Sequence, residues 1–260
     1  PDVPARCITN GDPGRRSHER HDLRMAGGAP DPGLADLITD PHLRGMKKKI
    51  GILGTGMVGQ VLATGFLKHG HDVMVATRVP EKVAPWREKH PELHVGTHKE
   101  VGAWADIVVL AVKGSAAEAA IRLCDAQDLA GKTVIDATNP IADAPPENGV
   151  LKFFTSLDRS LMEELQQVNP KAHFVKAFNS VGNAYMVDPG FGGVKPTMFI
   201  CGNDANAKQE VSAILDQFGW EAEDMGGVEA ARAIEPLCML WCIPGFIRNQ
   251  WTHAFKLLKH

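Results

Sequence analysis

The sequence predicts an α/β protein with a mainly parallel, doubly wound sheet and a smaller C-terminal α/β lobe. An apolar run at residues 49–53 leads through a glycine-rich turn into an amphipathic helix and a second apolar run, which is the pattern of a β-α-β unit. Apolar runs at 107–112 and 133–136 continue the alternation of buried strands with helices. This order is typical of a Rossmann-type domain.

The first β-α-β unit carries a local signal at each of its boundaries. Residues 49–53 are the kind of short apolar run that a strand buried on both faces shows. After the glycine string at 54–59, apolar residues recur at spacings of three and four, which predicts one buried helical face. Gly70 predicts a left-handed end to this helix, and residues 73–76 follow as the second strand.

The second half of the chain continues the alternation of strands and helices. Its predicted elements are strands at 172–178, at 197–201 and after Trp220, and helices at 157–168, from Asp204 to Gln217, and from Val228 onward. We therefore divide the folded chain into a nucleotide-binding domain at 46–150 and a C-terminal lobe at 151–260.

Two features of the last predicted helix bear on its surroundings. Glu229, Arg232 and Glu235 recur every third residue and predict exposed ion pairs on this helix. The segment 237–251 is rich in apolar side chains, so it is either core or, where exposed, a subunit contact or a pocket wall.

Residues 1–45 form a different kind of sequence. Twelve of these 45 residues are Gly or Pro and no apolar periodicity is sustained, so we expect the segment to be disordered. It has six arginines and no lysine, whereas sixteen lysines lie beyond residue 46. We interpret the segment as an extension upstream of a natural start at Met46, with a basic docking arm as the alternative.

Charge and cysteine content exclude several classes of protein. A formal net charge of −3 over 260 residues argues against a nucleic-acid-coating protein and against dependence on an anionic membrane. The uncharged stretch at 50–67 contains five glycines and is interpreted as strand, turn and helix rather than as a membrane span. The five cysteines include no CxxC pair and predict neither a disulfide framework nor a metal site. We expect a soluble, cytoplasmic protein.

The glycine string Gly54-Thr55-Gly56-Met57-Val58-Gly59 predicts a dinucleotide site. In a G-x-G-x-x-G turn, the first glycine allows the tight turn, the second lets backbone approach a pyrophosphate, and the third packs the helix against the strand. The N–H groups at the head of the helix attract the phosphates. The string is a weak signal alone, and it gains specificity from its place between a strand and a helix.

The end of the second strand predicts NADP(H) rather than NAD(H). An NAD site usually places Asp or Glu there to hold the ribose 2′-hydroxyl, but this chain has Thr77-Arg78, with Lys82 four residues later. A carboxylate would repel a 2′-phosphate, whereas a guanidinium can bind it with two hydrogen bonds. The alternative is that Arg78 is a solvated loop charge.

Two segments should meet the nicotinamide end of the cofactor, because both follow the carboxyl ends of buried strands. The backbone of Ala111, Val112 and Lys113 follows one strand, and Asn139-Pro140 follows the next. Asn139 could hydrogen-bond a carboxamide or a substrate carbonyl, or it could only cap the loop before Pro140. Lys113 is either a ligand contact or a solvated loop lysine.

Further motifs occur in order through the second half of the chain. Together with those above they are 49–59, Thr77-Arg78 with Lys82, 110–112, 176–180, 201–204, 224–227, Ala231-Arg232 and Glu235-Pro236. On these motifs, residues 47–260 resemble the family of NADPH-dependent coenzyme F420 reductases (F420H2:NADP oxidoreductases). The same fold forms the reductase domain of the STEAP metalloreductases.

The resemblance implies contacts for each part of the cofactor. Thr55, Gly56, Met57 and Val58 would face the pyrophosphate, Thr77, Arg78 and Lys82 would bind the 2′-phosphate, and Val112 and Ala116 would line the pocket further along. The resemblance also implies a homodimer of two-lobed subunits, in which the C-terminal lobe closes over a flat ring. Coenzyme F420 or a flavin would then be the small-molecule electron acceptor.

The expected chemistry is direct hydride transfer from nicotinamide C4 to a second bound ring, which needs no acid–base dyad. No catalytic residue is predicted, since Asp136 is expected to hold loop N–H groups. One alternative is an NADPH-dependent reductase of a small carbonyl or imine, which the strands predicted at 172–178 and 197–201 disfavour. The other is a module that senses NADP(H) without turnover.

Overall fold

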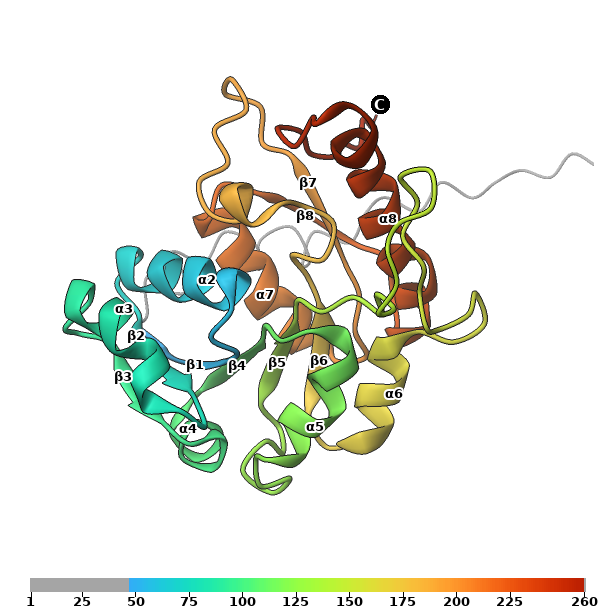
Figure 1. Ribbon diagram of the computed structural model, residues 1–260. Helices are drawn as coiled ribbons and strands as arrows, with labels where there is room; N and C mark the ends of the chain where they lie inside the picture. The colour runs from blue at the N-terminus through green and yellow to red at the C-terminus, as the bar shows by residue number, and fades with distance from the viewer. Residues whose placement is uncertain (1–46, 260) are drawn as a thin grey trace, which may run out of the picture. The chain divides into compact units, whose positions relative to one another are not determined.

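The computed structural model describes residues 47–259, so the disorder and the start site predicted for residues 1–46 lie outside the described residues. Within this range, strands and helices alternate as the sequence predicts (Figure 1). The strands are β1 (Lys49–Leu53), β2 (Asp72–Ala76), β3 (His94–Gly96), β4 (Ile107–Leu110), β5 (Thr133–Asp136), β6 (His173–Lys176), β7 (Thr197–Ile200) and β8 (Glu221–Asp224). The helices are α2 (Met57–Lys68), α3 (Ala84–Lys89), α4 (His98–Trp104), α5 (Ala117–Arg122), α6 (Leu161–Val168), α7 (Ala205–Gln217) and α8 (Ala231–Arg248).

Six strands form one parallel sheet in the order β3-β2-β1-β4-β5-β6. β1 pairs with β2 on one side and with β4 on the other, so the direction in which the sheet grows reverses between β1 and β4. In open sheets of this kind, ligands lie beyond the carboxyl ends of the strands at such a reversal. The predicted Rossmann-type fold is confirmed.

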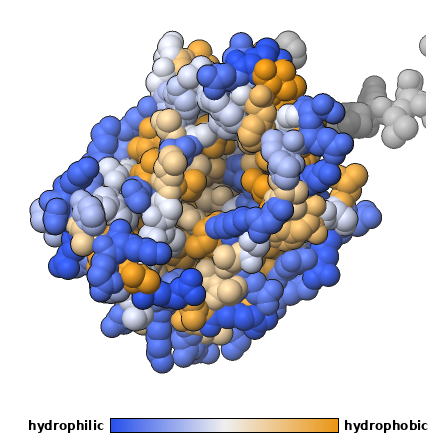
Figure 2. Space-filling view, in the orientation of Figure 1, coloured by the Kyte–Doolittle hydropathy of each residue, from blue (hydrophilic) through white to orange (hydrophobic). Residues whose placement is uncertain are grey.

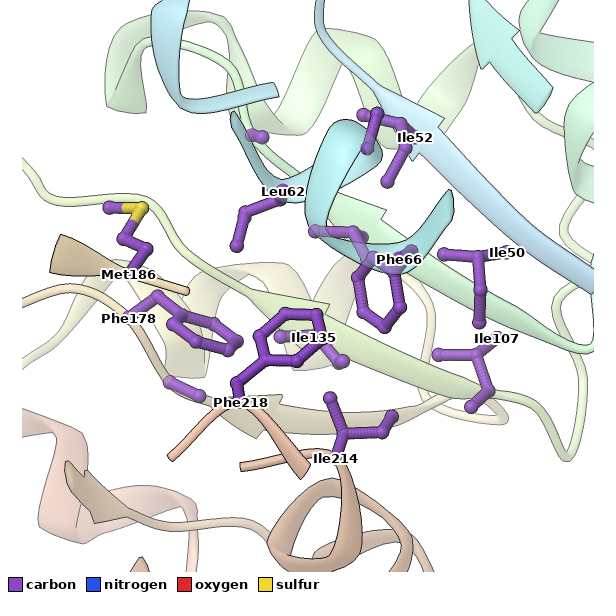
Figure 3. Packing of buried hydrophobic residues seen from close by; sticks show 14 of the residues in the cluster. Ile50, Ile52, Leu62, Phe66, Ile107, Ile135, Phe178, Met186, Ile214 and Phe218 are labelled. Atoms are coloured by element: carbon purple, nitrogen blue, oxygen red, sulfur yellow. The ribbon is translucent and has the colours of Figure 1, made fainter. Parts of the chain in front are cut away.

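Helices cover both faces of the sheet, as a doubly wound fold requires. On one face, α2 and α7 pack through Leu62, Phe66 and Ile214 against side chains of the central strands (Figure 3). On the other face, α4, α5 and α6 form a second buried cluster. Successive residues of β4 and β5 therefore point into two different cores, which is why every residue of both strands is buried.

β7 and β8 form a separate two-stranded parallel sheet, which with α7 and α8 makes up the C-terminal lobe (Figure 1). An antiparallel bridge between Lys176 and Cys201 joins this lobe to β6. β6 itself is the sixth strand of the main sheet, although it lies in the segment 151–260 that the sequence assigns to the lobe. The main sheet therefore draws on both predicted domains.

Three elements at one side of the sheet, α3, β3 and α4, are not among those predicted from the sequence. β3 has only three residues and none of them is buried. α4 begins at a capping box in which Thr97 accepts from the N–H of Glu100 while the Glu100 carboxylate accepts from the N–H of Thr97. A second capping box at Ser160 starts α6 at Leu161, four residues later than predicted.

α8 is apolar on most of its surface. Among the described residues, the stretch Val228–Arg248 is long and apolar enough to cross a bilayer by its length and composition, with a mean hydropathy of 1.3. In the structure its residues Ile234 and Trp241 are buried in protein, whereas Leu240 and Ile247 are more than half exposed. A second copy would cover such side chains in the homodimer that the resemblance implies, which stays a prediction.

The prediction of exposed ion pairs along α8 is wrong. Glu235 is only 2% exposed and pairs with Lys176, because α8 packs this side against the ends of β6 and α6. Arg232 pairs instead with Glu163 of α6. The Arg232 guanidinium, with the Ser160 cap, lowers the pKa of the Glu163 carboxyl to about 2 although partial burial opposes this.

Lys176 is a fully buried charge held by two carboxylates. Its Nζ lies 2.6 Å from Asp136 Oδ2 on β5 and 2.9 Å from Glu235 Oε1 on α8. Burial alone would lower the pKa of this lysine, but the two carboxylates outweigh burial and raise it. Glu235 also accepts from the N–H groups of Leu161 and Met162, so the network joins β5, β6, α6 and α8.

Lys176→Met should lower the free energy of unfolding by about 3–5 kcal/mol, because it leaves two buried carboxylates without their counter-charge. Lys152→Met is the matched control: it removes an exposed pair with Glu147 and should cost at most about 1 kcal/mol. Urea denaturation of both variants measures the difference. A loss at Lys176 as small as that at Lys152 would contradict the role given to the buried network.

Candidate functional site

The three glycines of the string between β1 and α2 have different surroundings. Gly54 has a φ of +131°, and a Cβ there would come within 2.3 Å of the carbonyl oxygen of Ala111. A Cβ on Gly59 would lie 2.2 Å from the carbonyl oxygen of Gly54. At Gly56, by contrast, a Cβ would meet no atom of the described residues within 4 Å. Backbone packing within the chain therefore requires glycine at the first and third positions, whereas the space beside the second glycine is not filled by the described residues.

Gly56 is also the N-cap of α2, and it provides no side-chain cap. In the part of the chain that the structure describes, no side chain caps the N–H groups of the first turn, which also have no intrahelical acceptor, so these groups can bind an anion. α2 has no acidic residue in its first turn, and Met57 beside the cap is 69% exposed. These features fit a diphosphate at the position that the sequence predicts.

Thr77 and Arg78 follow β2 and play different parts. Thr77 is buried, its N–H donates to the carbonyl oxygen of Gly96, and its hydroxyl is used within the turn by Val79. Arg78 is exposed. Partial burial of His98, together with the nearby Arg78 charge, lowers the pKa of this histidine. Within residues 47–259, no ion pair holds Arg78 or Lys82. Both cations can therefore bind a phosphate.

The segment after β4 contributes mainly backbone. Ala111 is buried, and its N–H donates to the carbonyl oxygen of Leu53 at the end of β1. Val112 is half-buried, and Ala116 is exposed at the end of a short 3₁₀ turn. Lys113 is exposed and pairs with Asp143, as a solvated loop lysine would.

Asn139 lies where the loops after β4, β5 and β6 meet, with Pro140 buried behind it. Its Nδ2 donates to the carbonyl oxygen of Asn179 at 2.8 Å, and Asn179 Nδ2 donates back to Asn139 Oδ1 at 3.2 Å. A Cβ on Gly114 would lie 2.0 Å from the carbonyl oxygen of Asn139, so the β4 loop also touches it. Asn139 therefore does more than cap its own loop.

The predicted site residues follow β1, β2, β4 and β5. Because these strands are parallel, the sheet brings the residues together at the carboxyl ends of the strands. Figure 2 shows a recess near the middle of the face seen in Figure 1. Asn179 is not among the site residues predicted from the sequence. Asn179 follows β6, just as Asn139 follows β5. The rule that ligands lie beyond the carboxyl ends of the strands, which predicts Asn139, therefore applies to Asn179 as well.

Comparison with known proteins identifies the family. Residues 49–140 match the family model described as NADP oxidoreductase, coenzyme F420-dependent. A crystal structure from Arthrobacter sp. FB24, described as an F420-dependent NADP reductase, is 33% identical, with a TM-score of 0.76, and the match covers 82% of this chain and 100% of that one. This chain belongs to the coenzyme F420-dependent NADP oxidoreductase family. It is therefore an NADP-dependent oxidoreductase.

Other relatives of this NADP-dependent oxidoreductase match over part of their length. Metalloreductase STEAP3 of Rattus norvegicus is 31% identical over 201 residues, which are 75% of this chain and 38% of STEAP3. The NADPH-dependent reductive aminase of Aspergillus oryzae is 35% identical over 95 residues, which are 36% of this chain and 32% of the aminase. The chain thus spans about a third of the length of these curated relatives. The resemblance inferred from the sequence motifs is confirmed.

The glycine string yields a matched pair of substitutions. Gly56→Ala should lower the free energy of unfolding by at most about 1 kcal/mol, because alanine is a poorer N-cap than glycine but its Cβ meets no neighbour, yet it should weaken NADP+ binding about tenfold or more. Gly54→Ala should cost about 2 kcal/mol or more, because of its positive φ and the Ala111 carbonyl. Thermal melts and calorimetric titration with NADP+ measure both quantities. Wild-type affinity in Gly56→Ala would contradict the diphosphate position.

Proposed function

We propose that this protein transfers a hydride between NADP(H) and a deazaflavin or flavin acceptor such as coenzyme F420. The match to the Arthrobacter reductase carries this proposal, because it extends over that protein's whole length and so includes the C-terminal lobe as well as the nucleotide-binding part. The sequence similarity to the Aspergillus oryzae reductive aminase covers 36% of this chain.

In this proposal, the residues of the chain bind and orient the reactants. The N–H groups at the head of α2 bind the diphosphate, Arg78 and Lys82 bind the 2′-phosphate, and the loops after β4 and β5 hold the nicotinamide ring. When bound, NADPH supplies the hydride from C4 of this ring. Transfer between two rings depends on holding them at reacting distance and on excluding water.

The contacts of Asp136, whose carboxylate lies next to the proposed nicotinamide position, support a mechanism that uses no catalytic acid or base. Asp136 ends β5 and is fully buried, and its Oδ1 accepts from the N–H of Thr138 at 2.9 Å, as the sequence predicts. Its other oxygen is bound to Lys176. Neither Asp136 nor Lys176 has access to a substrate, so neither is available to move a proton.

A second candidate function is reduction of a small imine or carbonyl compound. The 35% identity to an NADPH-dependent reductive aminase favours it. Such a reduction must protonate the substrate as well as deliver a hydride, and the buried Asp136–Lys176 pair does not supply that proton. A module that senses NADP(H) without turnover is the remaining alternative.

Arg78→Glu tests the cofactor part of the proposal. The variant should raise the Kd for NADPH more than about tenfold and leave the Kd for NADH within about twofold, since only NADPH carries the 2′-phosphate. Arg122→Glu is the control. It makes the same charge reversal at an exposed arginine that pairs with Glu118 on α5 and is not a predicted site residue. Equal changes for the two cofactors at Arg78 would contradict the assignment.

A screen of electron acceptors tests the reaction itself. NADPH oxidation, followed at the nicotinamide absorbance band, should have a kcat/KM at least about tenfold higher with coenzyme F420 than with FMN, FAD, ferric chelates or a cyclic imine. Preferred turnover of the imine would establish the second candidate function instead. Tight NADPH binding without oxidation by any acceptor would favour the sensing module.

A further inference from the structure

Asparagine side chains from the ends of β5 and β6 are bound to each other and to α8. Besides its two bonds with Asn139, Asn179 donates from Nδ2 to the carbonyl oxygen of Ile234 at 2.9 Å. A carbonyl oxygen can only accept, so this contact fixes which end of the Asn179 amide is Nδ2. Through Asn179, the orientation of the Asn139 amide is therefore fixed by α8.

The backbone on both sides of the pair is anchored in the core. Thr138, next to Asn139, donates its N–H to Asp136, and its carbonyl oxygen accepts from Lys176 Nζ at 3.1 Å. Phe178, next to Asn179, has a φ of +63° although its ring is 1% exposed. A bulky residue adopts this conformation only where its surroundings enforce it, and such strain gathers at functional sites. Figure 3 shows the Phe178 ring packed beside Phe218 in the core.

The pair has hydrogen-bonding capacity left over. Asn179 is 3% exposed, and its Oδ1 has no hydrogen-bond donor among the described residues. Asn139 is half-buried, and it retains a second N–H on Nδ2 and a second lone pair on Oδ1. Buried polar atoms in folded proteins are nearly always hydrogen-bonded, so a missing donor at this place points to a ligand.

We propose that Asn139 binds a planar amide edge of the ring ligand, with one C=O and one N–H group, and that Asn179 is its positioning residue. Asn139 Nδ2 donates to the C=O group. The N–H group supplies the donor that the pair lacks, directly or through a water molecule. This inference rests on the proposed function.

The strand order indicates which ligand brings the amide edge. In a sheet of this order the dinucleotide crosses the reversal at β1 and β4, so one half lies over β2 and the other over β5. Because Arg78 follows β2, the nicotinamide half lies beside Asn139, and its carboxamide is the matching group. The pyrimidine edge of a deazaflavin or flavin carries the same pattern, so the test has an arm for each.

The first arm compares two ligands on the full chain. NADPH carries the carboxamide, whereas adenosine 2′,5′-bisphosphate has the same 2′-phosphate and lacks the nicotinamide. Asn139→Ala and Asn179→Ala should each weaken NADPH binding about tenfold and leave adenosine 2′,5′-bisphosphate binding within about twofold. Fluorescence and calorimetric titrations measure both. If Asn179→Ala does not fold, Asn139→Ala and the isosteric Asn139→Asp carry the test.

Asn169→Ala is the matched control. Asn169 is also 3% exposed and donates to a backbone carbonyl oxygen, that of Ala126, but it lies before β6, at the opposite end of the strand from Asn179. Its variant should change stability without changing the affinity ratio of the two ligands. A role of Asn179 in stability alone would give the same result as this control and would also leave the KM for coenzyme F420 unchanged, and that combination would overturn the proposal.

The second arm measures the KM for coenzyme F420. A rise of about tenfold with unchanged NADPH affinity assigns the amide edge to the acceptor ring and still supports the recognition proposed here. No change for any ligand, or an equal loss of adenosine 2′,5′-bisphosphate binding, overturns it. Failure of the proposed function is distinguishable, because the wild-type protein would then bind NADPH without oxidising it with coenzyme F420.

Discussion

A lysine charge without access to water constrains how the main sheet and the C-terminal lobe of this chain fit together. Lys176 can remain charged in the core only because Asp136 comes from β5 and Glu235 from α8. Glu235 in turn accepts from the first N–H groups of α6. Any displacement of α8 relative to the sheet would separate these charges, so the lobe is held in one position against the carboxyl edge of β5 and β6.

Because of this constraint, the carboxyl ends of the strands present two kinds of surface. Around β5 and β6, buried polar groups fix the backbone, and Asn139 and Asn179 extend from that rigid base. Around β1 and β2, the surface is an uncapped helix end and exposed cations. The first arrangement suits recognition of a ring by directed hydrogen bonds, whereas the second suits phosphates, which need charge and N–H donors.

Much of the fold could be predicted from the sequence, because its signals are local. The apolar run of β1, the glycine turn and the spacing of α2 lie next to one another in the chain. Glu235 shows what local patterns miss: its spacing from Arg232 is the same on an exposed helix as on a buried one, and only packing against β6 determines its partner. β3 was missed because three residues carry no periodicity. The Asn139–Asn179 pair joins two loops distant in sequence, so no spacing rule reports it.

A crystal structure of the protein with NADP+ would show directly whether the head of α2 and Arg78 bind the two phosphate-bearing parts of the cofactor. We predict that diphosphate oxygens accept from the N–H groups at the head of α2, and that the 2′-phosphate lies about 2.7–2.9 Å from the Arg78 guanidinium. A diphosphate placed away from Gly56, or a 2′-phosphate in solvent with Arg78 turned away from it, would contradict this cofactor position.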